Sequence, residues 1–404
     1  MRRSLIVLGR ALTIAVVLAW TTAFRSDLIK SNFPFVARAQ LRCHRWLSQV
    51  AVRRPKVRLV TVVEIDDAAF YGTDFNGEQP VSRHALASLV EKIANRGALV
   101  VALDVQFVAP STGHVSEDDR RFVTSMRTIA GAGTPVVLTY VLTRADSNEF
   151  RLAPPLFVPG GSLTAGHINL PVDKRQIPLR MPYLDSTNQK LWIDSFAMEI
   201  VKAYESTVAM KVTTPTDRII EAAEHEGEFV YGGFVDPDDF NQVSAASVLD
   251  GTYQGTFRGR IVLVGGTWHR VASGLGPLVE SFPSPVGPIP GLYLHANYVE
   301  ALLDDRFEGE VPVWAAIAFD LAVAGALFVV IERARNRRGL VLAVFAIGLA
   351  IVFVAYVTLT NIGLYLDLIL PIGVYVVHLA IEDYCGHRWP VRARVASNDQ
   401  PFGP

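Results

Sequence analysis

The sequence predicts an α/β domain, with a largely parallel sheet and helices on both faces, joined to a four-helix transmembrane part. Within residues 57–310, short β-branched runs alternate with helical patterns, which is typical of right-handed crossovers between parallel strands. Half of all residues are apolar, and many of them lie in long segments outside that region. One such segment precedes the domain and three follow it, so we expect four membrane crossings.

A helix needs about 20 apolar residues to cross a bilayer. Four segments meet this requirement: residues 5–24, 313–331, 340–360 and 362–381. We interpret the first as a retained anchor rather than a cleaved signal peptide, because its apolar core is long and no small-x-small cleavage site follows it. The predicted parts of the chain are an anchor (1–24), a basic juxtamembrane linker (25–56), the enclosed domain (57–310), three transmembrane helices (313–381) and a short tail (382–404).

Lysines and arginines near the span ends predict the orientation in the membrane. Arginines gather in the loop 332–339, in the tail 382–404 and at Arg2 and Arg3, and four spans place all of them on one side. We expect that side to be the cytoplasm, with both termini there and the domain outside. Residues 25–58 hold nine Lys or Arg and one acid, which taken alone argues for the opposite orientation. We expect this stretch to lie against anionic lipid headgroups.

Cysteine content and charge exclude several classes of protein. The chain has two cysteines, Cys43 and Cys385, and the predicted topology puts them on opposite sides of the membrane. They therefore form neither a disulfide framework nor a cysteine-based metal site. The net charge is −1, and no domain-wide basic face is present, so nucleic-acid binding is not expected.

Period, caps and glycines define the elements of the domain. Ser82 is a plausible helix cap, and Gly97 ends the helix that Ser82 begins. The predicted strand at 257–266 likewise ends in glycines. The predicted strands lie at 57–67, 98–105, 135–142, 229–234 and 257–266, a hairpin or meander at 166–183, and the helices at 82–95, 118–129, 195–204, 245–249 and 290–305.

The candidate site lies at the carboxyl ends of the strands, where open parallel sheets bind ligands. Carboxylates and a flexible turn follow three of the predicted strands, and an arginine and a histidine begin two of the helices. These residues are Asp66, Asp67, Arg83, Asp104, Gly265, Gly266, Thr267 and His295. If the strands are neighbours, the site suits a cation, a polyol or an amine. The identity of a metal, if one binds, is not predicted.

Structural roles are the alternative for the same side chains. An aspartate at a strand end often caps the next helix, and we favour this role for Asp67, whereas Asp66 and Asp104 fit both roles equally. Arg83 fits an ion pair with one of these carboxylates, without a ligand. His295 fits a hydrogen-bonded residue at a helix start better than a ligand contact.

Known catalytic templates are absent from the sequence. It has no GxSxG elbow, no HExxH helix and no phosphate-binding loop ending in GK[ST]. The stretch GGTWHRVASG contains glycines but lacks the GxGxxG spacing of dinucleotide-binding turns. We therefore predict no cofactor and no enzymatic activity.

Several segments, in the right order, resemble one domain family, CHASE-2. They are VVEIDDAAF, RGALVVALDVQFVAPS, GHINLPVDKRQIPLRMPY, VSAASVLDG, FRGRIVLVGGT and IPGLYLHANYVEALLDDR, within residues 57–306. The resemblance implies an extracytoplasmic sensory module of bacterial receptors, with one span before it and three behind. It thus implies a location in the bacterial inner membrane, and it implies no general set of catalytic residues.

The chain also departs from the family's pattern. Gln79 precedes Pro80 where the family usually has tryptophan, and SGLGPLVE lacks the aspartate that usually precedes a threonine-proline. The resemblance therefore does not carry over a shared ligand. Only 23 residues follow Ile381, which is too few for the cyclase or kinase that the family usually carries. The sequence therefore predicts that a separate protein is the effector.

Three hypotheses follow. The first is an inner-membrane sensor that binds an unknown small ligand or a partner and signals to a separate effector. It is surrounded by membrane lipids and forms a homodimer or a complex with another membrane protein. The second is an accessory or structural subunit of an envelope complex. The third, which we favour least, is an extracytoplasmic hydrolase that uses Asp66, Asp67 or Asp104.

Overall fold

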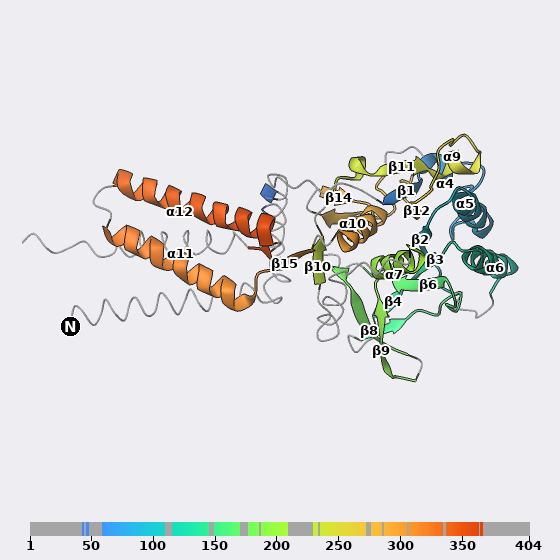
Figure 1. The fold of residues 1–404 in the computed structure, drawn as a ribbon, viewed down its shortest axis with the longest axis horizontal. Coiled ribbons are helices and arrows are strands. Elements are labelled where there is room, and N and C mark those ends of the chain that lie inside the picture. The colour runs from blue at the N-terminus through green and yellow to red at the C-terminus, as the bar shows by residue number, and fades with distance from the viewer. Residues whose placement is uncertain are drawn as a thin grey trace, which may run out of the picture. The chain divides into compact units, whose positions relative to one another are not determined.

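A computed structural model places most of the chain (Figure 1). It describes residues 43, 46–47, 59–109, 115–144, 149–169, 177–185, 187–208, 229–232, 235–271, 276–284, 287–304, 307–333, 337–362 and 364–366. The chain divides into two compact units. One comprises residues 44–309, and the other comprises residues 1–43 and 310–404.

A six-stranded sheet forms the centre of the unit 44–309. Every pair of neighbouring strands in it is parallel, as the alternation of strands and helices predicts. In spatial order the strands are β11 (Asn241–Ser244), β1 (Val60–Ile65), β12 (Ile261–Gly266), β2 (Val100–Gln106), β3 (Val136–Tyr140) and β6 (Leu163–His167). The α/β class and the parallel sheet are confirmed.

Helices cover both faces of this sheet (Figure 1). Side chains alternate between the faces with period two, so Val60 and Val62 pack against one set of helices and Val63 and Ile65 against the other. Val60 and Val62 face α7 (Phe196–Val208) and α10 (Gly291–Leu303). The opposite face carries α4 (Asp67–Phe70), α5 (Arg83–Asn95), α6 (Glu117–Gly131) and α9 (Ala245–Leu249).

Serine caps fix the starts of two of these helices. The Ser82 hydroxyl accepts a hydrogen bond from the backbone N–H of Ala85, at 3.3 Å, so the predicted cap is confirmed. Ser116 does the same for α6, accepting from the N–H of Asp119 at 3.0 Å. Each cap satisfies one of the N–H groups that a helix start leaves without an internal partner.

Shorter strands form smaller sheets beside the main one. One sheet holds β4 (Leu142–Arg144), β5 (Phe150–Leu152), β8 (Arg180–Leu184) and β9 (Lys190–Asp194). Elsewhere β10 (Phe229–Gly232) pairs with β7 (Ile177–Pro178) and with β15 (Phe307–Glu310), and β13 (Phe282–Ser284) pairs with β14 (Gly287–Ile289).

The predicted hairpin at 166–183 is wrong. Gly166 and His167 belong to β6 and pair in parallel with β3, whereas β8 pairs with β9. The turn predicted at 173–176 lies outside the described residues. The first part of this segment therefore belongs to the main sheet. The local sequence pattern did not predict that pairing.

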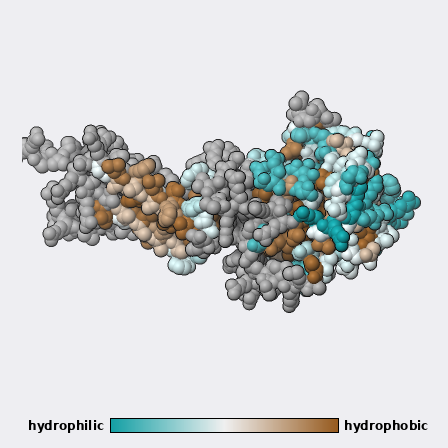
Figure 2. Space-filling view, turned by 45° about the horizontal axis from the view of Figure 1, so that its top comes forward, coloured by the Kyte–Doolittle hydropathy of each residue, from teal (hydrophilic) through white to brown (hydrophobic). Residues whose placement is uncertain are grey.

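The other unit contains α11 (Val313–Arg333) and α12 (Arg337–Val357), followed by a π-helical turn at Thr358–Ile362 and a short strand, β16 (Leu364–Tyr365). Apolar residues gather over these helices (Figure 2). Within the described part of the chain, no helix combines the length and hydropathy required to span a membrane. The predicted anchor, the tail, Cys385 and most of 362–381 lie outside the described residues.

Candidate functional site

A row of positions in register crosses the carboxyl ends of three adjacent strands. Glu64 of β1 pairs with Gly265 of β12, and Gly265 pairs with Asp104 of β2. Residues in register on parallel strands point to the same face, and this row continues the positions that face α7 and α10. Neighbouring strands lie 4.7–4.9 Å apart, so the backbones of Glu64 and Asp104 are about 10 Å apart, with only a glycine between them.

Gly265 is required by close packing on this row. A Cβ at this position would lie 2.9 Å from Cδ1 of Leu292 in α10 and 3.0 Å from Cβ of Asp104. Real Cβ atoms essentially never approach other heavy atoms so closely. The glycine therefore lets α10 approach the sheet and leaves space between the two carboxylates.

A local irregularity in β2 surrounds Asp104. The register between β2 and β3 shifts between Ala102 and Gln106, and the Thr139 hydroxyl donates a hydrogen bond to the carbonyl of Val105. Irregularities of this kind change the direction of side chains and are common beside functional sites. This one lies at the carboxylate that the sequence predicted.

Glu64 is held by hydroxyl groups. The Tyr293 hydroxyl of α10 donates to Oε1 of Glu64 at 2.9 Å, and the Thr267 side chain also hydrogen-bonds it. Burial raises the pKa of Glu64, the two hydrogen bonds oppose that rise, and the charge of Asp66 adds to it. Glu64 was not among the residues predicted from the sequence.

Asp104 carries the largest carboxyl pKa shift. The residue retains some exposed surface, but burial of its carboxyl group, followed by repulsion from Glu280, raises its pKa to about 8. Glu280 is exposed as a residue, yet its Oε2 turns toward the start of α10, 3.1 Å from where a Cβ on Gly291 would lie. Burial raises the pKa of Glu280 too, and Arg270 opposes the rise. We call Glu64, Asp104 and Glu280 the carboxyl rim.

Asp66 and Asp67 have local partners instead. Asp66 caps α4, and its Oδ1 accepts from the N–H of Ala69 at 2.8 Å. Asp67 accepts from the backbone N–H of His269 at 2.7 Å and contacts its Nδ1 at 2.8 Å. Partial burial favours a higher pKa for Asp67, but the His269 hydrogen bonds outweigh it and lower that pKa. Asp66 thus takes the capping role offered as its alternative, whereas Asp67, for which capping was favoured, does not cap α4 and contacts His269 instead.

The turn after β12 is fixed to α4. Trp268 is buried and stacks on Phe70 with ring centroids 4.1 Å apart. A Cβ on Gly266 would lie 2.2 Å from the Trp268 ring, so this glycine makes room for the indole. The Tyr71 hydroxyl donates to the carbonyl of His269 at 2.8 Å. Gly266 therefore serves packing on the α4 face, whereas Gly265 and Thr267 lie at the carboxyl rim.

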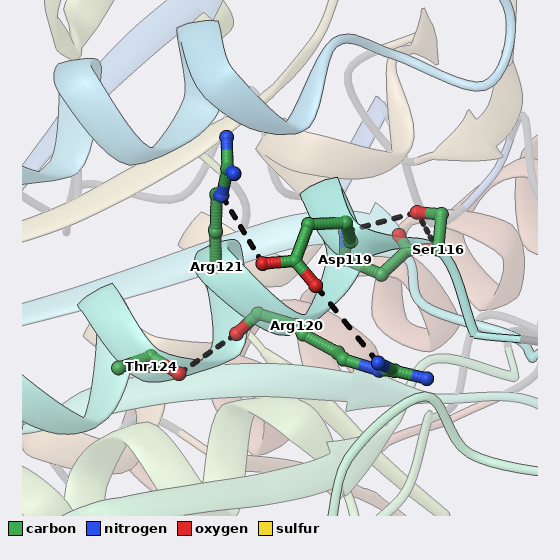
Figure 3. A network of polar contacts seen from close by, with 6 residues as sticks. Ser116, Asp119, Arg120, Arg121 and Thr124 are labelled. Atoms are coloured by element: carbon green, nitrogen blue, oxygen red, sulfur yellow. Dashed lines mark hydrogen bonds and ion pairs between the residues drawn. The ribbon is translucent and has the colours of Figure 1, made fainter.

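Arg83 lies apart from the rim and has another partner. Its Nε is 3.0 Å from Oδ1 of Asp119 in α6, and its guanidinium carbon lies 4.9 Å from the centroid of the Phe107 ring. The predicted pairing of Arg83 with Asp66, Asp67 or Asp104 is wrong. Figure 3 shows the first turn of α6, in which the Ser116 hydroxyl also donates to Asp119, at 2.7 Å.

His295 lies in the first turns of α10 and is 1% exposed. Its ring makes an edge contact with Phe196 at a centroid distance of 5.2 Å. Burial, followed by the nearby His167, lowers the pKa of His295 to about 3. The ring is therefore neutral at physiological pH, and its Nδ1 has no hydrogen-bond partner among the described residues.

The site therefore gathers Asp104, Gly265 and Thr267 of the predicted set and adds Glu64, Tyr293 and Glu280. A period-two signal for Glu64 was present, because Val60, Val62 and Glu64 alternate on one face. Among the described residues, no three His, Cys, Asp or Glu side chains are grouped to hold a metal ion. The arrangement offers three carboxyl groups whose pKa values are raised, together with hydroxyl groups. A positively charged ligand would stabilise the deprotonated form of these carboxyl groups.

Comparison with known proteins identifies one family. A family model described as "CHASE2 domain" matches residues 12–331. No curated protein and no solved structure matches the chain.

Proposed function

Because the chain belongs to the CHASE2 domain family, a family of extracytoplasmic sensory domains, we propose that it is a non-catalytic membrane sensor. In this proposal the domain binds a cation or an amine at the carboxyl rim. Binding shifts the packing of the proposed transmembrane helices that flank the domain, and a separate effector protein responds to that shift.

The row formed by Glu64, Gly265 and Asp104 is the observation that carries the ligand class. The two carboxyl groups share one face, and a glycine leaves space between them. Burial raises both pKa values, and the charge of Asp66 adds to the rise at Glu64 and that of Glu280 to the rise at Asp104. A positive ligand stabilises the charged form of each group and so relieves this penalty. Since Asp104 has a pKa of about 8, it is mostly protonated at pH 7 and loses its proton when a cation binds.

Calorimetry on the full chain in detergent or nanodiscs tests this site. Calcium chloride and spermidine are titrated separately, at pH 7, in two buffers with different ionisation enthalpies. We expect spermidine to bind at micromolar to millimolar concentration with release of up to about one proton. We expect calcium to bind more weakly, because the described residues offer no group of three ligands for a metal ion. The two titrations distinguish a metal ion from an amine.

The Asp104→Asn variant removes one rim charge and its proton. We expect it to weaken binding at least about tenfold and to abolish proton release. Glu91→Gln is the control, because it removes a carboxylate from exposed α5 surface, away from the rim. Equal binding by Asp104→Asn and the wild type, or no binding of either probe, would contradict the ligand class.

The membrane topology is part of the proposal. From the hydropathy of the sequence, and not from the helices that the structure describes, we propose four spans at 5–24, 313–331, 340–360 and 362–381, with lipids around them, the domain outside and both termini in the cytoplasm. Exposed apolar side chains on α11 and α12 support contact with lipid. They are Trp314, Val329, Leu342, Phe345, Leu349, Phe353 and Val354.

The two cysteines test the orientation. In whole cells, the Cys385→Ser variant retains Cys43, and we expect a membrane-impermeant thiol reagent to label it. The Cys43→Ser variant retains Cys385, which we expect to react only after permeabilisation. The reverse pattern would invert the topology. Light scattering and co-purification from the same membranes test the proposed homodimer or complex with another membrane protein.

A further inference from the structure

Helix α10 contacts β1 at both ends of that strand. Near the start of α10, the Tyr293 hydroxyl donates to Oε1 of Glu64, at the carboxyl end of β1. Near the end of α10, Oε1 of Glu300 accepts the backbone N–H groups of Leu59 and Val60, at 2.8 and 2.7 Å, where β1 begins. Tyr293 and Glu300 are two helical turns apart, about 10 Å along the axis. The helix therefore runs antiparallel to the strand and is fixed at both of its ends.

Glu300 is an unusual residue for such a position. It is 0% exposed, and carboxylates are almost never fully buried unless paired. A neutral backbone turn could satisfy the same N–H groups. A carboxylate forms stronger hydrogen bonds with them. The residue therefore holds the beginning of β1 firmly against α10.

The beginning of β1 and the end of α10 lie together at this end of the helix. Leu59 is the first residue of the continuous described stretch that enters β1. Leu303 ends α10, and the chain continues to β15 and then to α11. Glu300 accepts from Leu59 and lies three residues before Leu303, so it joins the chain that enters the sheet (the entry) to the chain that leaves α10 (the exit). The carboxyl rim lies at the opposite end of the same helix.

Helix α10 is packed and hydrogen-bonded along its length, so we expect it to move as a rigid body. Twelve of its 13 residues are buried. Asn297, halfway along, accepts from the N–H of Val235 at 2.6 Å and donates to the carbonyls of Val235 and Tyr293 at 3.1 and 2.9 Å. Packed helices shift as rigid elements by 1–2 Å rather than bending, because close-packed interiors deform little.

We propose that α10 is a rigid strut that couples the carboxyl rim to the entry and exit of the chain, with Tyr293 as its contact at the rim and Glu300 as its contact at the connections. A change in the Tyr293–Glu64 hydrogen bond moves α10 along β1. This movement changes the hydrogen bonds between Glu300 and the backbone N–H groups of Leu59 and Val60. Its use in signalling rests on the proposed sensor function, whereas the coupling itself is a property of the ligand-free domain.

Hydrogen exchange on the ligand-free full chain tests the coupling. Tyr293→Phe removes one hydroxyl at the rim. We expect exchange at the Leu59 and Val60 amides to accelerate about tenfold relative to a core amide of β3, such as that of Leu138. Tyr71→Phe is the matched control, because it removes one hydroxyl at the same end of the sheet but on the α4 face. We expect it to leave both amides unchanged.

A substitution at Glu300, at the other end of α10, gives a second test of the coupling. Glu300→Gln keeps an acceptor oxygen but loses the charge, so we expect it to loosen α10 at the chain connections. Coupling is reciprocal, so the Tyr293–Glu64 bond weakens and the pKa of Glu64 rises by about half a unit or more in an NMR titration. Glu91→Gln, on exposed α5 surface, is the control and is expected to leave that pKa unchanged.

Three outcomes would overturn the strut. The first is unchanged exchange at Leu59 and Val60 in Tyr293→Phe. The second is equal acceleration of Leu59, Val60 and Leu138 in that variant, which is the pattern of global destabilisation. The third is an equal response to Tyr71→Phe. None depends on ligand, so a protein that binds spermidine but shows no coupling retains the proposed function and refutes the strut.

Discussion

Two pairs of carboxylates lie on opposite faces of the same sheet end and have opposite electrostatic character. On the α10 face, Glu64 and Asp104 have pKa values raised by burial. On the α4 face, Asp66 caps a helix and Asp67 has a pKa lowered by its bonds to His269. Two positions along the chain separate Glu64 from Asp66. Local partners therefore decide whether a strand-end carboxylate stabilises the fold or is available to a ligand.

A substitution at Gly265, between Glu64 and Asp104 on the α10 face, gives the largest expected change in stability. Gly265→Ala places a Cβ against Leu292 and the Cβ of Asp104, and we expect it to destabilise the domain by about 2–3 kcal/mol. Gly131→Ala, where no heavy atom lies within 4 Å of the added Cβ, is the control and is expected to be neutral or slightly stabilising. Urea unfolding of the full chain measures both. A neutral Gly265→Ala would mean that α10 does not pack against this row.

Asp104→Asn is expected to change the alkaline side of the stability profile. The folded pKa of Asp104 is raised to about 8, so its favourable contribution is complete below the unfolded pKa of 3.8 and is lost as pH rises toward 8. Asparagine does not titrate. We therefore expect the variant to gain about 2 kcal/mol over the wild type between pH 5 and 6.5. Unfolding measured at both pH values tests this, and parallel profiles for the two proteins would contradict a buried, neutral Asp104.

His295 governs the acid side with the opposite sign. Its folded pKa of about 3 lies below the ordinary histidine value of 6.5, so the unfolded chain binds the proton first. Stability is therefore lost as pH falls below 6.5, by about 1–2 kcal/mol at pH 5. In His295→Leu we expect this loss to be absent. Thermal unfolding at pH 7 and pH 5 compares the two proteins, and His84→Leu on exposed α5 surface is the control.

Local sequence patterns predicted most of the fold but only part of the site. The β-branched run before Asp66 and the cap at Ser82 predicted β1 and α5, because these signals act within a few residues. The partner of Arg83 is Asp119, 36 positions away, and the β6–β3 pairing replaced the predicted hairpin. Such choices depend on tertiary packing. The sequence prediction did not include Glu64, because it placed the site on residues that follow the strands, whereas Glu64 lies within β1.

Asp67→Asn gives the smallest expected effect and sharpens the comparison with Asp104. The folded pKa of Asp67 is lowered, so its stabilising contribution is present above the unfolded pKa of 3.8 and is lost as pH falls through the lower folded value. Both Asp67 and His269 are about one-third exposed, so solvent screening limits the loss at pH 7 to less than about 1 kcal/mol. We expect the difference from wild type to shrink as pH falls below 3.8 and to disappear below the folded pKa. A stabilising Asp67→Asn at pH 7 would place Asp67 with the carboxyl rim, and the two faces would then share one electrostatic character.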